Sequence, residues 1–161
     1  MLSYRTRAIL LVLGLLLQAA VVCFGQETSN ASKSIMENIS AEGNRPLLMN
    51  MLQHAGLTPL LTSQGNYTFL IPSEGALAQL QKMAPETARA VLSYHILEGK
   101  YRVEDMKDGS KLKTLQGETI SVCRKKGTLL LDGTRITVQN QEASNGVWHA
   151  LDGILMPKST P

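Results

Sequence analysis

The chain has 161 residues, of which 43% are hydrophobic, and a formal net charge of +3 from 16 basic and 13 acidic side chains. This length fits one ordinary domain with its own hydrophobic core. The small excess of positive charge does not provide the clustered field that binds phosphates, so nothing indicates a nucleic-acid partner.

The first 25 residues have the three-part layout of a secretory signal peptide. Arg5 and Arg7 precede an unbroken apolar run over residues 8–17, and the small residues Cys23 and Gly25 stand where a signal peptidase inspects the chain. We therefore expect cleavage after Gly25 and export to the periplasm, the cell surface or the extracellular space. Loss of the two arginines lowers the formal charge from +3 to +1.

Two alternatives stay open for residues 1–25. A lipoprotein signal would attach lipid at Cys23, although Val22 is bulkier than the residue usual before a lipidated cysteine. A retained anchor would have to cross a bilayer core of about 30 Å, and this apolar run is short for that. Removal of the leader would leave Cys123 as the only cysteine, with no internal disulfide. Because Cys123 lies in an alternating apolar run, we expect a buried thiol, with a reactive or intermolecular thiol as the alternative.

Residues 26–33 are polar and unpatterned, which predicts a flexible N-terminal segment, and helical patterns follow. Ser34, with Glu37 three residues later, predicts an N-cap and a capping box for a helix that ends at Gly43. A second helix is expected to begin at Pro46 and to stop at Gly56. Its wide apolar stripe indicates packing on a core.

The middle of the chain alternates between a strand and further helices. Tyr67 to Ile71 is a β-prone run that Pro72 ends, and Ser73 is expected to cap the helix that follows. Another helix is expected from Pro85. From Tyr94 onward the apolar period changes from helical towards alternating.

The last third of the mature region is predicted to be strands joined by hairpins. Glycine-containing pairs at 116–117, 126–127, 132–133 and 145–146 punctuate it. Helices come first and strands later, which predicts an α+β fold and not a doubly wound parallel sheet. The expected strands are residues 111–115, 119–123, 128–131, 135–139 and 147–156, preceded by one helical turn at 103–106.

Three segments in this order and spacing resemble the fasciclin-type (FAS1) domain family. They are Tyr67 to Leu77, Ser93 to Tyr101 and Asn145 to Pro157, and the family pattern runs close to TVFAPTNxAF, YHxxxGxY and NGVxHxIDxVLxP. The resemblance covers a domain at residues 34–157 and leaves residues 158–161 as a C-terminal tail. It implies a compact β-sandwich wedge with several helices packed at one edge.

Tyr94 and His95 match the middle family segment. In some animal members this region has been proposed as a receptor-adhesion determinant, so the resemblance implies a candidate interaction site here. The residues themselves favour a structural role, in which His95 is buried beside the first strand and bonds to backbone groups while Tyr94 packs its ring. Structural and direct binding roles both stay open.

The third segment supplies five more candidate residues for interaction or fold determination. Asn145, Gly146, His149 and Asp152 match the family pattern, whereas Trp148 stands where an aliphatic residue is usual. We expect Asn145 and Gly146 to be explained by backbone conformations with positive φ. Trp148 is interpreted as a core edge, partly buried, with an exposed anchor as the alternative. His149 and Asp152 would face opposite sides of a strand, so they are a poor ligand pair.

The sequence shows no phosphate loop, no nucleophile elbow and no closely spaced histidine pair. We therefore expect no catalytic, cofactor or metal site. The expected function is a monomeric, non-catalytic adhesion or interaction module that binds a surface or matrix protein or a polysaccharide, with membrane contact only through lipid at Cys23. The alternative is a small-ligand carrier or weakly evolved enzyme with a pocket near His95 or His149. Solvent access to these two imidazoles distinguishes the hypotheses.

Overall fold

The computed structural model describes residues 32–158, so the expected signal peptide, most of the expected flexible segment and the last three residues lie outside it. None of the helices in this range is both long and apolar enough to cross a membrane. The helices are α2 (Ile35–Glu42), α3 (Pro46–His54), α4 (Thr58–Thr62), α5 (Glu74–Leu80) and α6 (Pro85–Tyr94). The strands are β1 (Tyr67–Ile71), β2 (Ile96–Glu98), β3 (Lys111–Lys113), β4 (Thr119–Lys125), β5 (Thr128–Leu131), β6 (Thr134–Ala143) and β7 (Gly146–Leu151).

Helix α2 begins and ends as its sequence predicts. The backbone N–H of Ser34 donates to the Glu37 carboxylate at 2.6 Å, and the Glu37 N–H donates to the Ser34 hydroxyl at 3.2 Å, which completes the capping box. Gly43 ends the helix with φ of 64°, a conformation that glycine adopts at low cost. The first helix is therefore confirmed at both ends.

The other helices agree with the sequence in position, with two differences. Ser73 is the N-cap residue of α5, but its side chain makes no capping hydrogen bond. Helix α4 was not predicted, because its five residues are too few to show a helical period. It is held by burial of Leu61, which is fully inaccessible to solvent.

The seven strands form one strongly curled sheet in the order β2-β1-β7-β6-β5-β4-β3. All neighbours are antiparallel except β1 and β7, which run parallel over Tyr67 to Ile71 and Gly146 to Ala150. The two ends of the sheet approach each other at a bridge between Leu97 and Thr114. The sheet is therefore nearly closed, and the outer edge of β2 is partly covered.

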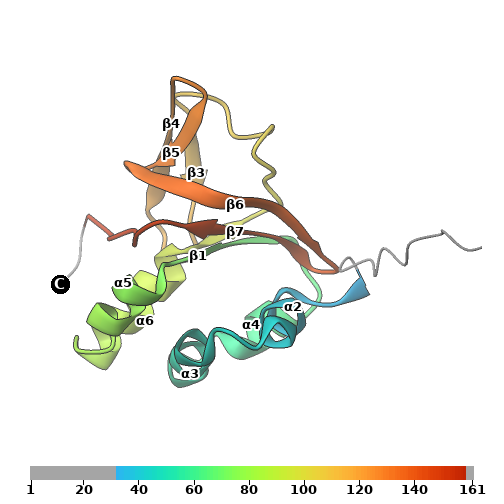
Figure 1. The fold of residues 1–161 in the computed structure, drawn as a ribbon, viewed down its shortest axis with the longest axis vertical. Helices are drawn as coiled ribbons and strands as arrows, with labels where there is room; N and C mark the ends of the chain where they lie inside the picture. The colour runs from blue at the N-terminus through green and yellow to red at the C-terminus, as the bar shows by residue number, and fades with distance from the viewer. Residues whose placement is uncertain (1–31, 159–161) are drawn as a thin grey trace, which may run out of the picture.

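Figure 1 shows the helices on one side of β1 and β7 and the strands β3, β4 and β5 on the other. This arrangement produces two hydrophobic cores. One lies between the helices and the sheet and includes Ile35, Leu52, Phe69 and Trp148. The other lies inside the curl of the sheet and includes Leu70, Tyr94, Ile120 and Leu131. Alternate residues of β1 thus face different cores, which confirms an α+β wedge with helices packed at one side.

Three expectations for the strands are corrected by the structure. Strand β7 stops at Leu151 and does not continue to Met156, because the chain bends at Asp152 and Gly153. Strand β6 is longer than predicted and contains irregular pairing between Ile136 and Gln141. Cys123 is exposed, because the alternation of β4 turns Ile120 and Val122 inward and places Cys123 on the opposite face.

Candidate functional site

His95 follows the last residue of α6 and lies immediately before β2, and its side chain is fully buried. Its Nδ1 lies 2.8 Å from the Val91 carbonyl oxygen, and its Nε2 lies 3.0 Å from the backbone nitrogen of Leu155. The carbonyl needs a donor and the N–H needs an acceptor, so the proton is on Nδ1. Burial lowers the pKa of His95 to about 4. The ring is therefore neutral near pH 7 and has no free nitrogen.

His149 lies on β7 and is also fully buried, but it is held in the opposite tautomer. Its Nδ1 accepts a hydrogen bond from the backbone N–H of Asn140 at 3.1 Å, so Nε2 carries the proton and donates to the Tyr101 carbonyl at 2.9 Å. Burial lowers the pKa of His149 as well. This histidine connects β7 to the irregular part of β6, where Asn140 has a φ of 54°.

Tyr94 is the last residue of α6, and its ring is fully buried in the core inside the curled sheet. Its hydroxyl donates a hydrogen bond to the Asp132 carboxylate at 2.6 Å. The other oxygen of that carboxylate accepts from the Ser121 backbone N–H at 3.0 Å. Burial and the bond to Asp132 raise the pKa of Tyr94. The side chain thus ties the helical side of the molecule to the β5–β6 turn.

Asn145 is buried, and its side chain joins three segments that are distant in the sequence. Its Oδ1 accepts from the Ile35 backbone N–H at 2.8 Å, and its Nδ2 donates to the carbonyls of Leu61 at 2.8 Å and Ser63 at 3.0 Å. Asn145 is not among the residues with positive φ. The expectation that backbone conformation explains this asparagine is therefore wrong, since the side chain accounts for it.

Gly146 is required by close contact between β7 and β1. A Cβ atom at this position would overlap the Tyr67 carbonyl oxygen and lie 2.9 Å from the Tyr67 backbone nitrogen. The φ of Gly146 is 152°, which side-chain-bearing residues rarely adopt. Only glycine fits where the two parallel strands begin their pairing.

Trp148 is 4% exposed and belongs to the core under the helices. The interpretation as a core edge is correct, and burial is more complete than expected. The guanidinium of Arg45, the residue before α3, lies 6.0 Å from the centre of the Trp148 ring. Trp148 is therefore not an exposed anchor for a partner.

Asp152 lies just after β7, on the surface, and makes local contacts. Its carboxylate accepts from the Arg135 backbone N–H at 3.0 Å and approaches the Arg135 guanidinium at 3.3 Å. Asp152 does not pair with His149, which agrees with the expectation that the two side chains face opposite sides. Within residues 32–158, no three side chains of the metal-binding types gather at one point.

The seven candidate residues therefore do not form one surface patch; they make separate contacts that connect different segments of the fold. Six of them are buried, and only Asp152 is exposed. Neither His95 nor His149 is open to solvent, so the expected pocket near these histidines is not supported. The imidazole that does line a surface hollow is that of His54, which the sequence analysis did not select.

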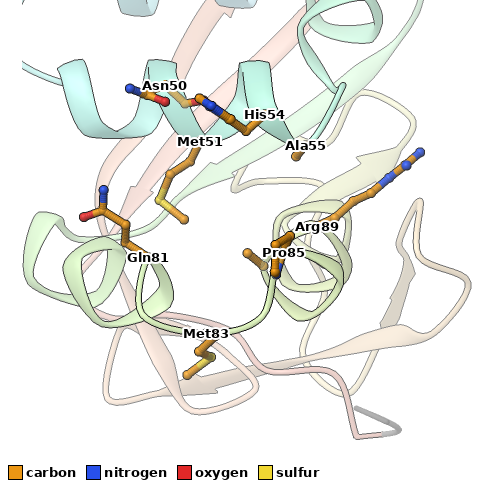
Figure 2. A pocket seen from close by; sticks show the side chains of 9 residues that line it. Asn50, Met51, His54, Ala55, Gln81, Met83, Pro85 and Arg89 are labelled. Carbon is orange, nitrogen blue, oxygen red and sulfur yellow. The ribbon is translucent and has the colours of Figure 1, made fainter.

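This hollow, which we call the α3–α6 groove, has a volume of about 420 Å³ and is open to solvent. Figure 2 shows α3 on one side and the α5–α6 connection with the start of α6 on the other. Its lining residues come from three short stretches: Asn50, Met51, His54 and Ala55; Gln81 and Met83; and Pro85, Ala88 and Arg89. The groove depends on how α3 packs beside α6, which no local sequence pattern indicates.

Comparisons with known proteins agree with the fold. The family model described as "Fasciclin domain" matches residues 44–157. The transforming growth factor-beta-induced protein ig-h3 of Sus scrofa is 31% identical over 140 residues, covering 81% of this chain and 20% of that protein. Human periostin is 26% identical over 151 residues, covering 88% of this chain and 18% of that protein. The chain therefore spans about a fifth of the length of these curated relatives.

Among solved structures, a FAS1 domain pair from the insect cell adhesion molecule fasciclin I superposes with a TM-score of 0.64. The sequence identity is 13%, and the match covers 80% of this chain and 52% of that one. At this identity the likeness concerns the fold alone.

Proposed function

Because this chain belongs to the fasciclin domain family, we propose that it is an exported, non-catalytic interaction module. It acts in the periplasm, at the cell surface or in the extracellular space, and its partner is a surface or matrix protein or a polysaccharide. The structural neighbour named above is a pair of FAS1 domains from a cell adhesion molecule, which supports the fold of such a module. Export is inferred from the pattern of residues 1–25, which carry the three parts of a signal peptide.

One observation carries the non-catalytic part of the proposal. Both ring nitrogens of His95 and both of His149 are bonded to backbone groups inside the molecule. A general base or a metal ligand must be reachable and must keep a free nitrogen. These two histidines therefore serve the fold, and we assign the same role to Tyr94, Asn145, Gly146 and Trp148.

The experiment is a binding measurement with protein purified after expression of the full-length chain. We expect saturable binding to a cell-envelope or matrix fraction, and loss of binding when the chain is heat-denatured. Protease treatment of the fraction abolishes binding if the partner is a protein, and periodate oxidation abolishes it if the partner is a polysaccharide. Absence of saturable binding to every fraction would contradict the proposal.

Two variants test whether the motif residues act only through the fold. His95→Ala and Trp148→Ala are expected to bind as well as the parent wherever they remain folded, since neither side chain reaches the surface. A variant with the parent's far-UV spectrum and melting temperature but without binding would show direct contact with the partner. N-terminal sequencing of the exported product tests the leader, with Gln26 as the expected first residue.

A further inference from the structure

The α3–α6 groove combines an apolar lining with polar groups from two sides. Met51, Ala55, Met83, Pro85 and Ala88 supply the apolar surface. Met83 is 41% exposed, and it is one of three large hydrophobic residues in residues 32–158 that stand out on the surface. Ligand binding that removes apolar surface of this kind from water is favourable.

Arg89 is distinguished from every other arginine of residues 32–158 by having no hydrogen bond, ion pair or ring contact. The four others are all engaged: Arg45 with Glu42 and Trp148, Arg102 with Glu142, Arg124 with the carbonyls of Val103 and Met106, and Arg135 with Asp152. Figure 2 shows that Arg89 rises from α6 and extends outward, away from Met51 and Met83. A cation without a partner in residues 32–158 therefore stands at the mouth of an apolar groove.

The remaining polar groups of the groove leave the positive charge of Arg89 unopposed. His54 uses Nδ1 to donate to the Asn50 carbonyl at 2.8 Å, and its Nε2 has no partner among the described residues. The side-chain amides of Asn50 and Gln81 also have none there. Among the residues that the structure describes, no aspartate or glutamate lines the groove. Its charge is therefore complementary to a carboxylate.

We propose that the α3–α6 groove binds an aliphatic monocarboxylate, with the chain on the methionine side and the carboxylate at Arg89. The volume of about 420 Å³ lies in the range of small-ligand sites, roughly 300 to 1,000 Å³. The groove's nine lining residues are few beside a protein interface, which takes about 20 to 30 residues from each partner. This ligand site is separate from the proposed adhesion function and does not depend on it.

Octanoate is the probe, and 1-octanol is the matched neutral compound. Protein from the full-length chain is labelled with ¹³C at the methionine methyl groups and titrated by NMR. The Met51 and Met83 signals report on the groove, whereas Met156 is a control because it is 42% exposed but lies outside the groove. We expect saturable shifts of the first two signals with octanoate, an affinity about fivefold lower for octanol, and no saturable shift of Met156.

Two substitutions separate the charge from the apolar surface. Arg89→Gln should reduce octanoate binding to the level of octanol without changing octanol binding, and its melting temperature should match the parent's because Arg89 has no partner to lose. Lys126→Gln removes one positive charge in the distant β4–β5 turn and should leave both affinities unchanged. Equal binding of octanoate and octanol, an unaffected Arg89→Gln variant, equal shifts at Met156, or no saturable shift would each overturn the proposal.

Discussion

The backbone N–H of Leu155 donates a hydrogen bond to Nε2 of His95 at 3.0 Å, across 60 residues of sequence. This bond requires a neutral ring, since a protonated imidazole has no lone pair left to accept it. The C-terminal segment after β7 is thus attached to the end of α6 through an imidazole that must remain uncharged. The stability of the fold should therefore depend on pH.

The free energy of unfolding is expected to decrease as the pH falls, because protonation of His95 favours the unfolded state. The pKa of His95 is about 4 in the folded chain and 6.5 in the unfolded chain, so the unfolded state binds more protons between these values. The stabilisation by the neutral ring is fully present above pH 6.5 and is lost as the pH falls to 4, by about 3 kcal/mol. Urea unfolding at pH 7.5, 5.5 and 4.5 measures this change.

The matched variant for this prediction is His95→Gln, which cannot titrate. It should be less stable than the parent at pH 7.5, and its stability should fall less steeply between pH 6.5 and 4.5. The residual slope includes His149, whose pKa burial also lowers. Equal slopes for the parent and the variant would show that His95 does not control the pH dependence.

Asn145→Ala should lower the free energy of unfolding by roughly 2 kcal/mol or more. The change leaves the Ile35 N–H without its acceptor and removes the donor to the Leu61 carbonyl, both inside the protein. Chemical denaturation measures the loss. Asn66→Ala, at an exposed asparagine with no side-chain hydrogen bond among those described, is the control and should change stability by less than about 0.5 kcal/mol.

Gly146→Ala should cost about 3 kcal/mol or more, because the new Cβ would overlap the Tyr67 carbonyl and separate β7 from β1. Gly75→Ala is the matched control. It lies on the exposed side of α5 with nothing within 4 Å of the added atom. The control should gain roughly 0.5 to 1 kcal/mol from helix propensity. Similar melting temperatures for the two variants would contradict the close contact of the strands.

Trp148 is the only tryptophan of the chain, so its fluorescence reports its environment directly. Because it is 4% exposed, we expect emission typical of an apolar site and weak quenching by iodide. Trp148→Ala should cost about 3 to 5 kcal/mol through the cavity it leaves. Arg45→Gln should cost less than about 1 kcal/mol, since it removes a partly exposed cation–π contact and a surface ion pair with Glu42. Strong quenching of the native protein would show an exposed ring.

Cys123 should react with a thiol reagent such as Ellman's reagent without denaturant, because its side chain is exposed on β4. Reaction should be complete in the native protein and absent in a Cys123→Ser variant that has also lost its leader. The serine substitution should leave the melting temperature unchanged, since no core contact is lost. A thiol that reacts only after unfolding would restore the prediction of burial.

The structure departs from the sequence-based expectations where the burial or the contacts of a residue depend on a distant segment of the chain. Alternation along β4 is visible in the sequence, but the face that turns inward is fixed by the curl of the sheet, and this exposes Cys123. Asn145 beside a glycine has the sequence of a tight turn, yet its side chain is used by Ile35 and Leu61 from other parts of the chain. The α3–α6 groove arises from two helices that are separated in the chain by strand β1 and by the helices α4 and α5. Local sequence patterns do not predict these contacts between distant segments.

The sequence by itself determined the elements whose signals are local. The capping box at Ser34, the glycine after α2, the prolines that begin α3 and α6, and the β-prone run of β1 depend on contacts within a few residues. The family motif indicated the fold class through its resemblance to known domains, although its residues act through contacts between distant segments. Only the tertiary structure decided that β1 lies parallel to β7 and that both motif histidines are hydrogen-bonded to backbone groups at both ring nitrogens. It also decided that Arg89 faces solvent without a partner among residues 32–158. Those features depend on long-range packing, in which residues far apart in the chain compete for the same space and the same hydrogen bonds.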